Sequence, residues 1–220
     1  MEDTRAAPSG RRSRRVLAAA LAVGVVGLTA VVATQADAEV PMATATLRDP
    51  RGSAVGRVRF FDDHGHTVVR VRLTPNAGVA PEQFHGFHIH VGTDATSGTG
   101  GCLADPAKPS NTWFVSAGGH LKEDGQVHAG HTGDLQSLHV NGDGTADSTF
   151  TTDRFSPDEL AGKAVILHAG ADNFGNVPTG AGAEQYTANT PAAVTRTQNT
   201  GNAGDRVACG VISGGGRRDD

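Results

Sequence analysis

The chain has 220 residues, a length that suits one domain with short terminal segments. Its 19 basic and 23 acidic side chains give a net charge of −4. Residues 1–38 contain five arginines and three acidic residues, so the rest of the chain has a net charge of −6. This charge argues against a nucleic-acid-binding protein, which needs a basic face. The 30 glycines and the low aromatic content of 5% favour strands and turns over helices.

The first 38 residues have the pattern of a secretory signal peptide. The basic segment Arg11–Arg15 precedes the uncharged run Val16–Ala33, and the small-residue triplet Ala36–Ala38 offers a cleavage site. We expect cleavage after this triplet, export from the cytoplasm, and a mature domain over residues 39–213 with a flexible tail over 214–220. A retained membrane anchor is the alternative, because an apolar run of this length just spans a bilayer. The export route stays open.

Short apolar runs between glycine-rich turns predict eight β-strands. The pattern is clearest over residues 67–73, where Val69, Val71 and Leu73 share one face and two arginines share the other. Farther along, Ser156–Leu160 predicts a single capped helical turn. Many short strands with turn signals between them are typical of an all-β sandwich or barrel. The expected strands lie near residues 44–47, 57–61, 67–73, 84–90, 135–140, 145–151, 164–168 and 206–212.

Two long stretches, residues 92–134 and 170–205, match no strand. Loops of this length inside one domain are usually functional or disordered. The first is rich in glycine and histidine, which favours a functional role. Export also favours pairing of Cys102 with Cys209, the only two cysteines in the chain.

The ten histidines are distributed unevenly and predict a metal site. His88 and His90 share one face of an expected strand, because side chains alternate with a period of two. His168 ends an apolar run. The first loop adds His120, His128, His131 and Asp134. A set of imidazole and carboxylate ligands without thiolate suits copper or zinc. We expect four other histidines to face solvent, namely His64, His66, His85 and His139.

Five segments resemble the copper-zinc superoxide dismutases and occur in that family's order. They are Gly86–His90, Ser116–His120, His131–Asp134, Leu167–Asp172 and Gly201–Ile212. The last of these fits the closing signature of the family along its whole length. The resemblance covers residues 42–213 and implies an eight-stranded Greek-key β-barrel, similar to an immunoglobulin-like sandwich, with two long functional loops.

The resemblance also implies a role for each candidate site residue. His120 would bridge two metals and take up a proton during catalysis, Asp172 would link a copper ligand to a zinc ligand, and Arg206 would attract the anionic substrate. Cys102 and Cys209 would form the disulfide bond of the family. The copper ligands would be His88, His90, His120 and His168, and the zinc ligands His120, His128, His131 and Asp134.

The activity implied is conversion of superoxide to oxygen and hydrogen peroxide by one-electron cycling of copper, because zinc has no redox chemistry. A non-catalytic copper-binding or copper-delivery module on the same barrel is the alternative, although the retained histidines and Arg206 favour the enzyme. The gap between His128 and His131 is shorter than in the family, so a copper-only enzyme is the alternative to a copper-zinc enzyme. Beyond superoxide we expect no nucleic-acid or stable membrane partner, and a homodimer stays open.

Overall fold

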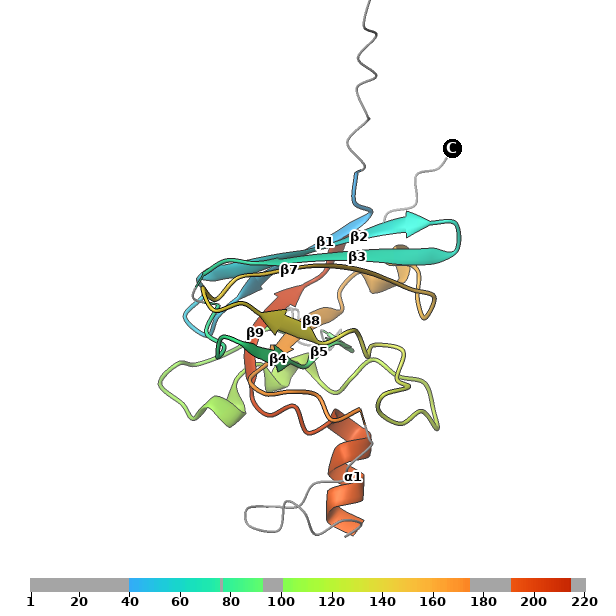
Figure 1. Ribbon diagram of the computed structural model, residues 1–220. Coiled ribbons are helices and arrows are strands. Elements are labelled where there is room, and N and C mark those ends of the chain that lie inside the picture. Colours follow the sequence, from blue (N-terminus) through green and yellow to red (C-terminus); the bar gives the residue numbers. More distant parts are fainter. Residues whose placement is uncertain (1–39, 76, 93–100, 175–190, 215–220) are drawn as a thin grey trace, which may run out of the picture. The chain divides into compact units, whose positions relative to one another are not determined.

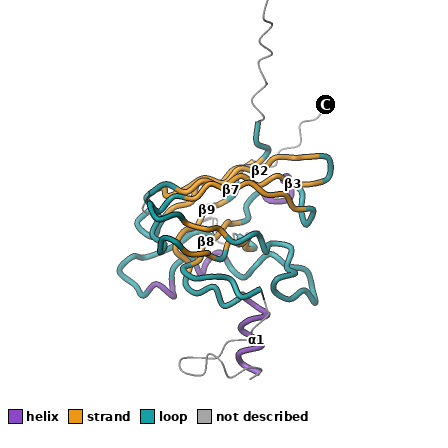
Figure 2. The backbone as a smooth tube through the Cα atoms, viewed as in Figure 1, coloured by secondary structure: helices purple, strands orange, loops and turns teal. Residues whose placement is uncertain are grey.

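The computed structural model describes residues 40–75, 77–92, 101–174 and 191–214. The expected signal peptide lies outside the described residues, as does the expected tail except for Gly214. Strands dominate the described part of the chain, which confirms the all-β prediction (Figures 1 and 2). The strands are β1 (Ala43–Arg48), β2 (Ala54–Asp63), β3 (His66–Leu73), β4 (Gln83–His85), β5 (Phe87–His90), β6 (Leu138–Val140), β7 (Ala146–Thr152), β8 (Ala164–His168), β9 (Arg206–Val211) and β10 (Ser213–Gly214).

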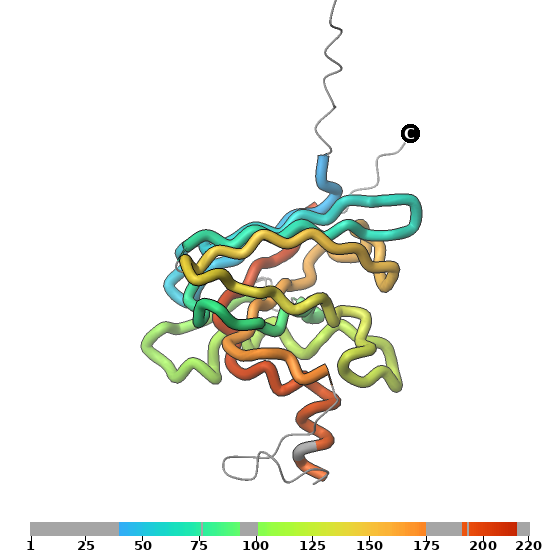
Figure 3. The backbone as a smooth tube through the Cα atoms, in the orientation of Figure 1, coloured from blue at the N-terminus to red at the C-terminus, as the bar shows by residue number. Residues whose placement is uncertain are grey.

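Eight strands form one curled antiparallel sheet with the order β5-β8-β9-β1-β2-β3-β7, and β10 adds to β1. Several neighbours are far apart in sequence. β9 near the C-terminus runs between β8 and the N-terminal β1 (Figure 3), and β3 pairs with β7. Such long-range antiparallel neighbours are what a Greek-key arrangement requires. β4 and β6 form a separate two-stranded sheet.

The alternation in the sequence explains which face of each strand is buried. In β3 the side chains of Val69, Val71 and Leu73 point into the core, whereas Arg70 and Arg72 are exposed. The core lies between the two halves of the curled sheet and contains Phe60, which packs edge-on against Phe155 with ring centroids 6.5 Å apart. The core side chains therefore fill the space between the two halves of the sheet, and the long loops lie outside this core.

The expected strand over residues 84–90 is in fact two strands, β4 and β5, divided at Gly86. β4 pairs with β6, whereas β5 pairs with β8. The break changes the facing of the side chains, so His85 is fully buried and the expectation that it faces solvent is wrong. Counting alternate positions through residues 84–90 assigns His85 to the wrong face, because the strand is interrupted at Gly86. His64, His66 and His139 are exposed, as expected.

The predicted helical turn is present as the 3-10 helix Pro157–Leu160, capped by reciprocal hydrogen bonds between Ser156 and Glu159. The long loops contain no strand in their described parts. They carry two short 3-10 helices, Ser110–Thr112 and Val115–Ala117, and the helix α1 (Pro191–Thr200).

Helix α1 was not expected from the sequence. It begins at Pro191 and is followed by Gly201, which has a φ of +58° and donates its N–H to the carbonyl of Thr197. Proline at the first helical position and glycine just after the end are a recognised pair of boundary signals. Among the described residues, no helix has the length and apolar character needed to cross a membrane.

The central position of Phe60 generates a stability prediction. Phe60→Ala removes a fully buried ring from the core and is expected to lower the free energy of unfolding by about 3–5 kcal/mol. Chemical denaturation measures this change. The matched control is Phe84→Ala, because Phe84 is 56% exposed and its removal should change stability by no more than about 0.5 kcal/mol. Equal effects of the two substitutions would contradict the assignment of the core.

Candidate metal centre

Four histidines from three parts of the chain meet at one end of the barrel. His88 and His90 come from β5, His168 ends the neighbouring strand β8, and His120 reaches the group through a bridge between its backbone and that of His90. All four side chains are buried. One ring nitrogen from each lies within 4.8 Å of the others. The pairing of β5 with β8 therefore brings together ligands that are 80 residues apart in sequence.

Three of these rings have one anchored nitrogen and one nitrogen without a partner. His88 Nε2 lies 2.6 Å from Asp172 Oδ2, His90 Nδ1 donates to the carbonyl of Gly118, and His168 Nδ1 donates to that of Gly204. The opposite nitrogens, His88 Nδ1, His90 Nε2 and His168 Nε2, are buried without a hydrogen-bond partner. Buried nitrogens are rarely left unpaired. Lone pairs that face one another in this way fit a metal ion.

Burial also sets the charge of these rings. Desolvation lowers the pKa of His88 to about 4 and that of His168 to about 3, and takes the pKa of His90 well below its usual value. Neighbouring histidines and Arg206 act in the same direction on His90 and His168. The three rings are therefore neutral at pH 7, which is the form that coordinates a metal.

A second group adjoins the first and shares His120 with it. His120 Nδ1 lies 2.8 Å from Asp134 Oδ1. His131 Nδ1 lies 3.3 Å from His120 Nδ1 and also 3.3 Å from Asp134 Oδ1. His128 Nδ1 lies 3.0 Å from the other carboxylate oxygen, Asp134 Oδ2. Tetrahedral zinc with bonds of about 2.0–2.1 Å separates its ligand atoms by about 3.3 Å. His131 matches this spacing to His120 and to Asp134 Oδ1, whereas His128 reaches the other carboxylate oxygen, Oδ2. The ligand atoms that all lie within 4.8 Å of one another belong to His88, His120, His128 and Asp134, and this set does not include His131.

Two buried carboxylates hold the second group together. Burial favours the neutral form of Asp134, but hydrogen bonds with His120 and His128 outweigh it and lower the pKa of this carboxyl well below its usual range. Asp172 behaves in the same way, because it accepts hydrogen bonds from His128 and His88. In return, both carboxylates raise the pKa of His128 to about 9 against the effect of its burial. The pair supplies the negative charge that a divalent cation requires.

Asp172 connects the two groups directly. Its Oδ2 lies 2.6 Å from His88 Nε2 and its Oδ1 lies 2.5 Å from His128 Nε2, and none of the three side chains has any solvent exposure. Gly201 packs against this bridge, and a Cβ at that position would overlap both the Asp172 carboxylate and the His128 ring. The backbone N–H of His128 donates to the carbonyl of Gln198 in α1, so this helix is attached to the same unit.

Arg154 fixes the short loop that carries the second group, a contact that the sequence did not reveal. Its guanidinium donates hydrogen bonds to the backbone carbonyls of Ala129, His131 and Asp134, at 3.1, 3.0 and 2.9 Å. Gln126 adds a second attachment inside the loop, because its Oε1 accepts from the N–H and hydroxyl of Thr132. Arginine has five N–H donors in a rigid plane and suits several carbonyls at once.

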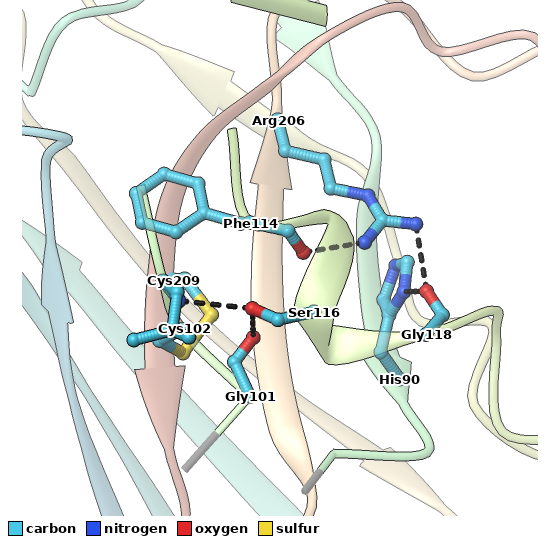
Figure 4. The surroundings of a disulfide bond; sticks show 9 residues. His90, Gly101, Cys102, Phe114, Ser116, Gly118, Arg206 and Cys209 are labelled. Carbon is cyan, nitrogen blue, oxygen red and sulfur yellow. Dashed lines mark hydrogen bonds between the residues drawn. A yellow bond between two sulfur atoms is a disulfide. The ribbon is translucent and has the colours of Figure 1, made fainter. Parts of the chain in front are cut away.

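Arg206 lies beside the first group at the start of β9 (Figure 4). It pairs with His168 across the strands and donates from Nη1 to the carbonyl of Phe114 and from Nη2 to that of Gly118, at 2.6 and 2.7 Å. The Gly118 carbonyl also accepts from His90 Nδ1. One loop therefore orients both a candidate copper ligand and the arginine. With five N–H donors, Arg206 keeps further donors for an anion.

The loop that holds Arg206 is fastened to the barrel by the expected disulfide. Cys102 and Cys209 are bonded, with a Cα–Cα distance of 5.5 Å and 107 residues between them. The Ser116 hydroxyl donates to the carbonyl of Gly101 beside the disulfide (Figure 4). Covalent attachment of this loop to β9 keeps Phe114 and Gly118 opposite the guanidinium.

His85 also supports the first group, although the sequence suggested an exposed residue. It is fully buried, and its Nδ1 lies 3.1 Å from the carbonyl of His168 while its Nε2 lies 2.8 Å from that of Ala80. These contacts attach the end of β8 to the segment before β4. The contact with His168 joins residues 83 positions apart and leaves no local signal in the sequence.

The fold and the two adjoining groups define a β-barrel protein with buried histidine and aspartate side chains that could hold metal ions. The sequence model of the family described as copper/zinc superoxide dismutase matches residues 54–212. A superoxide dismutase [Cu-Zn] of Mycolicibacterium paratuberculosis is 41% identical over 192 residues, which cover 83% of this chain and 79% of that relative. The chain belongs to the copper/zinc superoxide dismutase family.

Further comparisons agree with this assignment. The superoxide dismutase [Cu-Zn] of Mycobacterium tuberculosis is 42% identical over 78% of this chain and 70% of its own length, and that of Escherichia coli is 32% identical over 84% and 95%. Among solved structures, the clock protein EA4 has a TM-score of 0.55 and 25% identity, and the match covers 79% of this chain and 94% of that chain. Copper and zinc are accordingly the cofactors of this chain.

The role of Arg154 can be tested by substitution. Arg154→Ala removes three hydrogen bonds from the loop that carries the zinc-side residues, so zinc affinity should fall about 10- to 100-fold, as for other residues that orient metal ligands. Competition with a chromophoric chelator measures the affinity, and hydrogen exchange at the Asp134 amide reports the loosened loop. Arg59→Ala, an exposed arginine on β2, is the control and should leave both unchanged. Unchanged zinc affinity in Arg154→Ala would contradict the role.

Proposed function

We propose that this chain is an exported superoxide dismutase whose copper is held by His88, His90, His120 and His168. The substrate is superoxide, and two superoxide ions and two protons give one oxygen molecule and one hydrogen peroxide. The observation that carries the assignment is the convergence of three buried, unpartnered ring nitrogens whose opposite nitrogens are anchored. A non-catalytic copper-binding module needs no oriented arginine beside the metal, and this chain has one.

Bound copper supplies the one-electron redox chemistry, which zinc lacks. The chain determines the geometry around it. Asp172 orients His88, and the carbonyls of Gly118 and Gly204 orient His90 and His168, so that a lone pair of each ring faces the copper site. Rings held in this way need little reorganisation during redox cycling.

His120 is proposed to carry a proton. Its Nδ1 is engaged with Asp134 on the zinc side, which leaves Nε2 toward the copper-side group. A proton held at Nε2 can be transferred to a reduced oxygen species in the site. The zinc ligands are proposed to be His120, His128, His131 and Asp134, and zinc at Nδ1 would favour release of the proton from Nε2.

Arg206 is proposed to attract and orient the substrate. The whole chain carries a net charge of −4 and repels an anion at long range, so local positive charge is needed at the entrance. Superoxide dismutase is the established example of this type of steering. In the second loop, Arg196 is the only basic residue between positions 173 and 200, so most of the attraction is assigned to Arg206.

The proposal includes export. Residues 1–38 are proposed to be a cleaved signal peptide, the domain to span 39–213 and residues 214–220 to be a tail. The disulfide between Cys102 and Cys209 supports an oxidising compartment. The homodimer and the absence of nucleic-acid and membrane partners stay predictions from the sequence.

Loss of one ligand from each group tests the metal assignment. His168→Ala should abolish copper binding and dismutation while the barrel stays folded, because His168 ends a strand whose other side chains form the core. Asp134→Ala should lose zinc and keep copper. Metal stoichiometry by mass spectrometry after loading with both metals, together with circular dichroism, measures these outcomes. Wild-type activity in copper-loaded His168→Ala would refute the enzyme assignment, and a wild type with copper alone would refute the zinc site.

Substitution of Arg206 tests the steering role. Arg206→Glu should lower kcat/KM by about 10- to 1000-fold, the range over which steering changes association rates. It should also invert the salt dependence, because salt screens attraction in the wild type and repulsion in the variant, over a Debye length of about 10 Å at 0.1 M. Pulse radiolysis at a series of ionic strengths measures both. The same salt response in the two proteins would exclude steering by Arg206.

A further inference from the structure

Four arginines form a block on the outer face of the sheet. Arg57 and Arg59 lie on β2, Arg70 and Arg72 lie on β3, and all four are exposed. The strand register places Arg57 opposite Arg72 and Arg59 opposite Arg70. Alternation sends these side chains away from the core, so the block is a surface feature. Arg70 also stacks over the ring of Phe61, with its guanidinium carbon 4.2 Å from the ring centroid, a contact that leaves its charge in place.

This arrangement has an electrostatic cost within the fold. Like charges directly opposite each other on neighbouring strands are destabilising. Asp147 on β7 pairs with Arg72, but both side chains are well exposed, at 64% and 76%, so the pair offsets little of the repulsion. In the described part of the chain, no ion pair is recorded for Arg57 or Arg59. A concentrated positive patch therefore remains on a chain of net charge −4.

The block lines a shallow groove of about 400 Å³ on β1, β2, β3 and β7. Thr46 and Thr149 flank the arginines across the neighbouring strands and add hydroxyl groups. None of the exposed large apolar side chains among the described residues belongs to this groove. The lining is therefore suited to an anion with several oxygen acceptors and unsuited to insertion into a lipid bilayer, which uses apolar side chains.

The groove lies on the opposite half of the sheet from the metal centre. Figure 1 shows β1, β2, β3 and β7 in one layer, with β5, β8 and the long loops on the other side of the core. The metal-side histidines come from β5, β8 and those loops. An anion held at the arginine block consequently leaves the approach to Arg206 and the copper site open. Its position therefore gives the block no direct part in guiding superoxide to the metal centre.

We propose that the four-arginine groove binds linear polyphosphate and so tethers the enzyme with its metal centre facing away. Guanidinium groups match phosphate oxygens in bidentate pairs. Arginines two residues apart on a strand are about 6.6–6.8 Å apart at Cα, and those on adjacent strands about 4.7–4.9 Å. The block thus presents two successive pairs of guanidinium groups along β2 and β3, which suits a linear polymer better than a single phosphate.

Binding to linear polyphosphate tests this proposal. The wild-type protein should bind the immobilised polymer at low salt and release it as salt rises, while orthophosphate should compete weakly. Arg57→Gln with Arg59→Gln should abolish most of the binding and lower the slope of log affinity against log salt by about 1.4, at about 0.7 for each lost phosphate contact of a flexible polymer. The double variant should keep the dismutase activity of the wild type and an equal or higher Tm, because it relieves repulsion.

The matched control is Lys108→Gln with Lys122→Gln, which removes the same charge from exposed loop positions and should leave polyphosphate binding intact. Equal losses in the two double variants would mean that net charge alone governs binding and would overturn the site. No binding by the wild type would also overturn it. Binding to vesicles that contain anionic lipid, without binding to polyphosphate, would assign the groove to a membrane surface instead. Each outcome is independent of whether the chain dismutates superoxide.

Discussion

The metal centre depends on one shared carboxylate, that of Asp172. Its two oxygens contact His88 on β5 and His128 in the first loop, and the three side chains are completely buried. The strand that carries the proposed copper ligands His88 and His90 and the loop that carries the proposed zinc ligand His128 are thereby connected through one buried side chain. Gly201 leaves the space that this contact requires, and α1 attaches to the same loop through His128. Displacement of either group of ligands must disturb the other.

The features predicted from the sequence are those that depend on the order of neighbouring residues or on the cysteine count. Strand alternation predicted the β-fold and the shared face of His88 and His90, and the two cysteines predicted the disulfide. Resemblance to the family was needed for the bridging role of His120 and for Asp172, because residues in loops have no periodicity that fixes where they lie. The hydrogen bonds of Arg154 and the burial of His85 depend on tertiary contacts, so no local pattern reveals them. Helix α1 had a boundary signal, but its threonines weaken helix propensity.

The two halves of the sheet carry charged groups of different kinds. The buried groups on one half include the neutral rings of His88, His90 and His168 and the carboxylates of Asp134 and Asp172, which favour cations. The outer face of the other half carries the arginines of β2 and β3. A core only one sheet-to-sheet layer thick separates them, about 10 Å in a packed sandwich.

The account rests on the prediction that the two adjoining groups hold two different metals. Anomalous diffraction from crystals of the protein loaded with copper and zinc, recorded at both absorption edges, tests this most directly. We predict a copper peak at His88 Nδ1, His90 Nε2 and His168 Nε2. We predict a zinc peak at Nδ1 of His120, His128 and His131 with Asp134. His120 should contact both metals. A single copper peak, or zinc at any other place in the chain, would contradict the account.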